Sequence, residues 1–180
     1  MRALVPTLAV LGIALSAPAN GEVVETSPTG FSTRDTIVVA AAPDDVWIEL
    51  TDPAKWWNPE HSWSGDSANL TLYPEAGGCF CEALPKSGGS VEHARVIRSE
   101  PGELLRMRGA FGPLQSEALT GTLLITLEPV AGGTRINWDY VVGGHARFDF
   151  AAIAPAVDGV MSEQLGRLAD RLGRFKGGAN

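Results

Sequence analysis

Residues 155–175 read PAVDGVMSEQLGRLADRLGRF and have the spacing of one amphipathic helix. Apolar side chains recur at steps of three and four residues, at Val157, Val160, Met161, Leu165, Leu168, Leu172 and Phe175. This spacing places them in one stripe along about five helical turns, and Gly177-Gly178 follow as a stop signal. Residues 148–153 are expected to form a separate helical piece, because Pro155 interrupts the pattern. A helix with one apolar stripe needs an apolar surface to cover.

The chain before this helix supplies such a surface, because it has the pattern of an antiparallel sheet. Short apolar segments alternate with turns, and Gly132-Gly133 has the composition of a hairpin turn. The expected strands cover residues 31–40, 70–73, 79–84, 91–99, 104–110, 119–129 and 134–142. Two short helices, one beginning at Pro43 and one at Asp52-Pro53, follow the first strand. The sequence therefore predicts an α+β fold, with a curved antiparallel sheet of about six to seven strands wrapped around a long C-terminal helix.

The N-terminus has the pattern of a secretory signal peptide. Met1-Arg2 precede an apolar run over residues 3–15, and residues 16–19 read SAPA, a cleavage site of small residues. The run is too short to span a bilayer of about 30 Å. A retained N-terminal anchor is the less favoured alternative. We therefore expect export to the periplasm or to the outside, with no membrane span after cleavage.

The chain then divides into a signal peptide at 1–19, a flexible polar leader at 20–30 and one domain at 31–176. It has 14 Lys and Arg against 21 Asp and Glu, a net charge of −7, and no basic run. This balance argues against a nucleic-acid partner and against an anionic membrane surface. The common nucleotide, phosphate and zinc-protease motifs are absent from the sequence, so we expect no cofactor. Oligomeric state does not follow from these patterns.

Several local motifs, in a fixed order, point to one family. They are APDDVW at 42–47, Trp56-Trp57, Gly77-Gly78 ahead of Phe80 and Glu82, EPG at 100–102 and GGT at 132–134. With the terminal helix, they resemble the START-like or SRPBCC superfamily, which has the helix-grip fold. The branch is similar to that shared by polyketide cyclases and the activator domain of Aha-type co-chaperones.

This resemblance implies a cavity between the sheet and the long helix, where a small hydrophobic or amphipathic molecule binds. The superfamily has no single catalytic motif and includes carriers, enzymes and protein-binding modules, so enzymatic activity stays open. The alternative functions are a cyclase, dehydratase or hydrolase acting in the same cavity, and a protein-interaction module. The module would have a filled cavity and an exposed apolar patch.

The segment WWNPEHSWS at 56–64 holds three of the five tryptophans and a histidine. One interpretation is an aromatic gate over an apolar ligand, because tryptophan offers a large apolar area and one donor. In the other, the tryptophans cap the core and the histidine is solvated. The candidate cavity residues are Trp56, Trp57, His61, Trp63, Phe80, His93, Arg106, Tyr140, Met161 and Leu165.

The tetrapeptide Cys79-Phe80-Cys81-Glu82 lies on an expected strand, where residues two apart share a face. Both thiols would therefore face away from Phe80 and Glu82. The leading interpretation is a pair of semi-buried thiols or their oxidation to a disulfide, although Cα atoms about 6–7 Å apart are at the edge of disulfide geometry. A metal site of Cys79, Cys81 and His93 comes second, and a catalytic thiol third.

The enzyme hypothesis requires at least two of His61, His93, Arg106, Asp139 and Tyr140 to converge within hydrogen-bond reach. Tyr140 with Asp139 could serve acid–base chemistry, or Tyr140 could be a core ring with its hydroxyl hydrogen-bonded. Arg95 and Arg108 are expected to face outward, whereas the sequence leaves the direction of His93 and Arg106 open.

Overall fold

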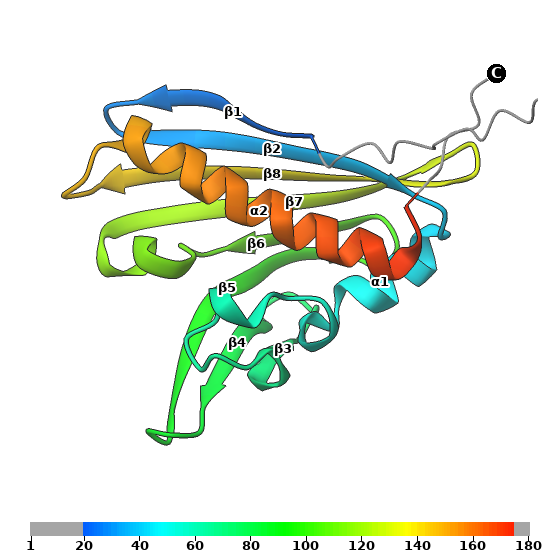
Figure 1. Ribbon diagram of the computed structural model, residues 1–180, viewed down its shortest axis with the longest axis horizontal. Helices are drawn as coiled ribbons and strands as arrows, with labels where there is room; N and C mark the ends of the chain where they lie inside the picture. Colours follow the sequence, from blue (N-terminus) through cyan, green and yellow to red (C-terminus); the bar gives the residue numbers. More distant parts are fainter. Residues whose placement is uncertain (1–19, 175–180) are drawn as a thin grey trace, which may run out of the picture.

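Eight antiparallel strands form one sheet in the computed structural model, which describes residues 20–174 (Figure 1). Their spatial order is β1-β2-β8-β7-β6-β5-β4-β3. The strands are β1 (Asn20–Ser27), β2 (Gly30–Val39), β3 (Leu70–Leu72), β4 (Cys79–Leu84), β5 (Gly89–Glu100), β6 (Leu104–Arg108), β7 (Ala118–Val130) and β8 (Gly133–His145). Helix α2 (Phe150–Leu172) lies across this sheet, which confirms the predicted α+β class.

Short helical elements fill the connections. Helix α1 (Pro43–Leu50) and the 3-10 turns η1 (Pro53–Lys55), η2 (Pro59–His61) and η3 (Ser67–Asn69) lie between β2 and β3. A further turn, η4 (Gly112–Ser116), joins β6 to β7. No helix in the described part of the chain is long and apolar enough to cross a membrane.

The leader expected at 20–30 is instead ordered, and this is the main correction to the predicted elements. It forms β1 and its hairpin to β2, with Gly21 opposite Asp35 and Ser27 opposite Gly30. Its polar composition reflects an edge strand whose side chains are mostly exposed, while Val23 packs against the core. With β1 included, the sheet has eight strands, more than the six to seven that the sequence predicts. The signal peptide expected at 1–19 and the domain end expected at residue 176 lie outside the described residues.

Helix α2 also differs from its prediction, because it runs through Pro155 without a break. The proline removes the hydrogen bond to the carbonyl of Ala151, but both residues are on the exposed side of the helix, where water can solvate that carbonyl. Asp149 caps the first turn by accepting a hydrogen bond from the Ala151 backbone N–H at 2.9 Å. The expected pieces at 148–153 and from Pro155 onward are therefore one helix.

The core lies between the inner face of the sheet and α2. Alternate residues of β2 are buried against the helix, and Met161, Leu165 and Leu168 of the predicted stripe face them. The two polar members of the β2 series, Thr33 and Asp35, are as buried as their apolar neighbours.

Candidate functional site

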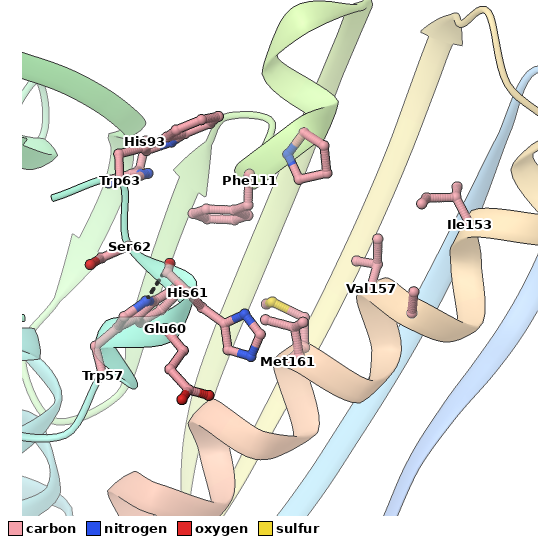
Figure 2. A pocket seen from close by; sticks show the side chains of 14 residues that line it. Trp57, Glu60, His61, Ser62, Trp63, His93, Phe111, Ile153, Val157 and Met161 are labelled. Atoms are coloured by element: carbon pink, nitrogen blue, oxygen red, sulfur yellow. Dashed lines mark hydrogen bonds between the residues drawn. The ribbon is translucent and has the colours of Figure 1, made fainter. Parts of the chain in front are cut away.

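A cavity of about 320 Å³ opens between α2, η4 and the segment 57–63 (Figure 2). Its walls are mainly apolar side chains, contributed by Trp57, Trp63, Phe111, Pro113, Ile153, Ala156, Val157, Val160 and Met161. Four polar residues also line it: Glu60, His61, Ser62 and His93. This composition is that of a site for an apolar molecule with few polar contacts.

Hydrogen bonds from α2 hold the segment 57–63 in place. The side chain of Gln164 accepts from the Asn58 backbone N–H at 2.8 Å, and Glu163 accepts from the Asn58 side-chain amide. Glu163 also lies 3.1 Å from His61 Nε2. The Trp57 indole N–H donates to the His61 carbonyl at 3.0 Å, which orients the ring (Figure 2). Helix α2 and the segment 57–63, which form two walls of the cavity, are thus hydrogen-bonded to each other at one end.

The structure divides the three tryptophans of the predicted gate. Trp57 is buried in the wall, and Trp63 lies at the rim with 56% of its surface exposed. Trp56 does not line the cavity: it is buried beneath, packs against Trp138 with ring centroids 5.9 Å apart, and donates to the Glu49 carbonyl. The gate interpretation thus fits Trp57 and Trp63, and the core interpretation fits Trp56.

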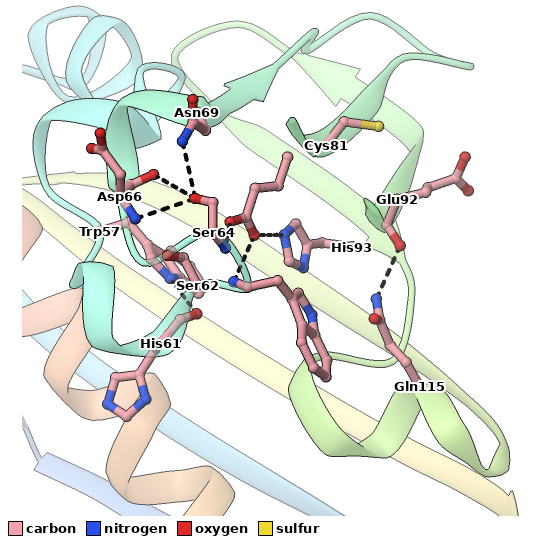
Figure 3. A network of polar contacts seen from close by, with 12 residues as sticks. Trp57, His61, Ser62, Ser64, Asp66, Asn69, Cys81, Glu92, His93 and Gln115 are labelled. Atoms are coloured by element: carbon pink, nitrogen blue, oxygen red, sulfur yellow. Dashed lines mark hydrogen bonds and ion pairs between the residues drawn. The ribbon is translucent and has the colours of Figure 1, made fainter. Parts of the chain in front are cut away.

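His93 faces the cavity from β5 and is 5% exposed. Its Nε2 lies 2.9 Å from Glu82 Oε2, and Glu82 also accepts hydrogen bonds from the backbone N–H groups of Trp63 and Ser64 (Figure 3). Burial raises the pKa of Glu82, but the hydrogen bonds from Ser64, Trp63 and His93 outweigh it and bring the pKa below its ordinary value. Burial lowers the pKa of His93 by more than Glu82 raises it.

The other candidate cavity residues lie elsewhere, apart from Met161, which lines the wall. Phe80 and Leu165 are buried in the core behind it. Arg106 alternates with the buried Leu105 and Met107 along β6, so its side chain is on the outer face of the sheet. Arg95 and Arg108 are also outward, as predicted, and Arg95 hydrogen-bonds to the Gly77 carbonyl.

Tyr140 is a core ring and does not line the cavity. Its hydroxyl donates to the Gly109 carbonyl at 3.1 Å and accepts from the Phe111 backbone N–H at 3.2 Å. Burial raises the pKa of Tyr140 far above its ordinary value, so it is a poor proton donor. Asp139 points to the opposite face, where it pairs with Arg34 at 2.6 Å. The hypothesis of a Tyr140–Asp139 acid–base pair is therefore wrong.

Cys79 and Cys81 form a disulfide, with Cα atoms 5.4 Å apart, closer than in a fully extended strand and within disulfide range. His93 is on the other face of the sheet, and in Figure 3 the Cys81 side chain points away from the His93 ring. No group of three or more His, Cys, Asp or Glu side chains suited to a metal ion is present among residues 20–174. A metal site of Cys79, Cys81 and His93 is therefore wrong.

Sequence reasoning missed the wall formed by Phe111, Gly112 and Pro113. The segment reads as a turn, and only the folded chain places a turn against α2. It also missed Asp35, which is 1% exposed. Burial raises the pKa of Asp35 to about 6, although a hydrogen bond from Ser162 opposes this. A turn motif gives no sign that it lines a cavity, and a single acidic residue in a strand pattern gives no sign that it is buried.

Comparisons with known proteins agree with this architecture. A family model described as polyketide cyclase / dehydrase and lipid transport matches residues 30–173. No curated protein matches. Among solved structures, the Aha1 dimer from Colwellia psychrerythraea is similar at 20% identity and a TM-score of 0.55, covering 81% of this chain and 98% of that one.

Two further structures have the same fold. DynU16, from the dynemicin biosynthetic locus, has 21% identity and a TM-score of 0.55, and the match covers 81% of this chain and 50% of that chain. A protein from Chromobacterium violaceum has 20% identity and a TM-score of 0.53, covering 80% and 98%. At these identities the likeness shows the fold alone.

Proposed function

The chain belongs to the polyketide cyclase / dehydrase and lipid transport family, and we propose that it binds a small hydrophobic or amphipathic molecule in the cavity between α2 and the segment 57–63. The observation that carries this proposal is the cavity itself. It has about 320 Å³ of space, mainly apolar walls and only four polar side chains. Such a site buries an apolar molecule and contacts it at a few polar points.

Binding is favoured over catalysis by the positions of the candidate chemical groups. Of the five residues that the enzyme hypothesis names, only His61 and His93 line the cavity. Each is hydrogen-bonded to a carboxylate of its own, Glu163 for His61 and Glu82 for His93. A cyclase, dehydratase or hydrolase would need several of these side chains to meet in the cavity, and Arg106, Asp139 and Tyr140 do not line it.

A protein-interaction module is also less favoured. The cavity is open rather than filled. The exposed large apolar side chains belong to different elements, from Val24 on β1 and Ile48 on α1 to Tyr73 and Ile97. Scattered exposed residues are normal on a soluble surface and do not make a docking patch.

We further propose that the protein works after export, in the periplasm or outside the cell. The signal-peptide pattern at 1–19 motivates this. The disulfide between Cys79 and Cys81 supports it, because disulfides persist in oxidising compartments and are rare in the cytosol. The intact mass of the purified protein tests it: we expect a chain beginning at Asn20, and a chain that retains residues 1–19 would contradict cleavage.

Native mass spectrometry of the protein from its own compartment, followed by denaturing extraction, tests binding. We expect extra mass that releases a small apolar organic molecule. Replacing Ala156, at the cavity wall, by tryptophan should lower the bound fraction at least tenfold, because the indole fills the space. The matched control is Ala151→Trp, on the same helix but outside the cavity. Equal occupancy in the two variants would show that the ligand binds elsewhere.

A further inference from the structure

His93 differs from the other polar residues of the cavity because it alone is buried. Glu60 and His61 are exposed at the rim, and the Ser62 hydroxyl donates to the Pro59 carbonyl at 2.8 Å. The His93 ring packs against the Phe80 ring in a tilted arrangement with centroids 5.0 Å apart, which restricts its orientation. A buried polar group in an apolar wall has a strong effect on which ligands bind, because leaving it unpaired costs free energy.

The contacts of Glu82 assign the proton on the His93 ring. A carboxylate can only accept hydrogen bonds, and the ionised form of Glu82 is favoured by two backbone N–H donors, from Trp63 at 3.0 Å and from Ser64. The third contact, at 2.9 Å from His93 Nε2, must therefore be donated by the ring. With its pKa lowered by burial, the ring is neutral near pH 7, and Nδ1 carries a lone pair.

The Nδ1 atom is available to a ligand. Within residues 20–174 it makes no hydrogen bond, and it is not among the fully buried polar atoms that lack a partner, so it has accessible surface. Since His93 lines the cavity, we infer that this surface faces the apolar chamber. Nδ1 is thus a hydrogen-bond acceptor in the cavity wall, set in place by Glu82 from behind.

We propose that His93 Nδ1 is the polar anchor of the ligand, which is therefore an apolar molecule carrying a hydroxyl or N–H donor, such as a phenol or an alcohol. This inference rests on the proposed binding function. It also disfavours carboxylate ligands, because an anion would face a lone pair with the negative charge of Glu82 behind it. Ethers and ketones of the same shape would leave Nδ1 unpaired.

Three probes of one shape test the donor requirement: 2-naphthol, 2-methoxynaphthalene and naphthalene, titrated by calorimetry at pH 7.5. We expect 2-naphthol to bind about three- to tenfold more tightly than either analogue, the effect of one neutral hydrogen bond. His93→Phe keeps a planar ring and removes Nδ1, so the preference should disappear. The control His145→Phe changes an exposed histidine outside the cavity and should keep it.

The outcomes separate the two proposals. Equal affinity of the wild type for all three probes would overturn the anchor and leave the proposed function standing. Binding of none of them would contradict the proposed function, and the anchor with it. A preference that survives in His93→Phe would also overturn the anchor. If His93→Phe does not fold, ¹⁵N spectra of ring-labelled wild type decide: the Nδ1 resonance must be that of an unprotonated nitrogen and must move with 2-naphthol but not with naphthalene.

Discussion

Replacing Asp35 by asparagine should stabilise this protein at neutral pH. Asp35 lies on the inner face of β2, 1% exposed, and accepts a hydrogen bond from the Ser162 hydroxyl of α2. Its other oxygen, Oδ2, has no partner within the described residues. The nearby charges are also negative: Asp158 on α2 raises the pKa of Asp35, and Glu22 on β1 raises that of Asp158. The folded protein therefore holds an anion that pairs with no cation among residues 20–174 and lies near further negative charge.

The magnitude follows from the pKa of Asp35, which burial raises from 3.8 to about 6. The folded state then binds more protons than the unfolded state between pH about 4 and 6, so the free energy of unfolding falls as the pH rises through this window. A difference of about 2 pKa units corresponds to about 3 kcal/mol. An asparagine stays neutral and still accepts from Ser162. We therefore expect Asp35→Asn to gain up to about 3 kcal/mol at pH 7.5 and almost nothing at pH 3.5.

Urea unfolding of both proteins between pH 3.5 and 8 measures this directly, because the titrating groups that are not coupled to Asp35 cancel in the difference between the two proteins. The control is Asp139→Asn, the same change at a partly exposed carboxylate paired with Arg34 on the outer face. It should change stability by less than about 1 kcal/mol. If Asp35→Asn is less stable than the wild type at pH 7.5, or if the difference in stability does not vary with pH, the Asp35 anion is not a destabilising charge.

The remaining predictions concern two structural contacts. Tyr140→Phe leaves the Gly109 carbonyl and the Phe111 N–H without their partner and should lower the free energy of unfolding by about 1–3 kcal/mol, whereas Tyr73→Phe, at an exposed ring, should not. The double change of Cys79 and Cys81 to serine opens a three-residue loop and should cost about 1.6 kcal/mol by the chain-entropy estimate. Thiol titration of the denatured, unreduced protein should find no free thiol, and two would contradict the disulfide.

Local periodicity was enough to predict most of the fold. The strand predicted at 79–84 has the bounds of β4, and the strands predicted at 119–129 and 134–142 fall within β7 and β8. Alternation and turn residues act over a few neighbours, so they can be read from the chain alone. The strand β1 was missed because an edge strand buries little, and its exposed side chains look like those of a loop.

The direction of His93 could not be predicted, because one irregularity in pairing sets it. Between β4 and β5, Phe80 pairs with Ala94 and Cys81 with Glu92, so His93 is an extra residue in a bulge. Regular pairing would place His93 opposite Cys81, on the face of the two thiols, which is the arrangement that a metal site needs. A bulge of one residue turns the side chain to the other face, and alternation in the sequence gives no sign of it.

The bulge brings His93 to the face of Glu82, so this one carboxylate contacts both the rim of the cavity and its buried polar residue. The carboxylate of Glu82 holds the backbone at Trp63 and Ser64, at the rim, and also the ring of His93, inside. A ligand bound at His93 Nδ1 would polarise the same hydrogen-bond network that holds the rim. Gln164 and Glu163 of α2 bind the other end of the segment 57–63. At Trp63 the rim is instead bound to Glu82, which is on the sheet. Ligand recognition at His93 and the position of the rim at Trp63 are therefore expected to depend on the same carboxylate.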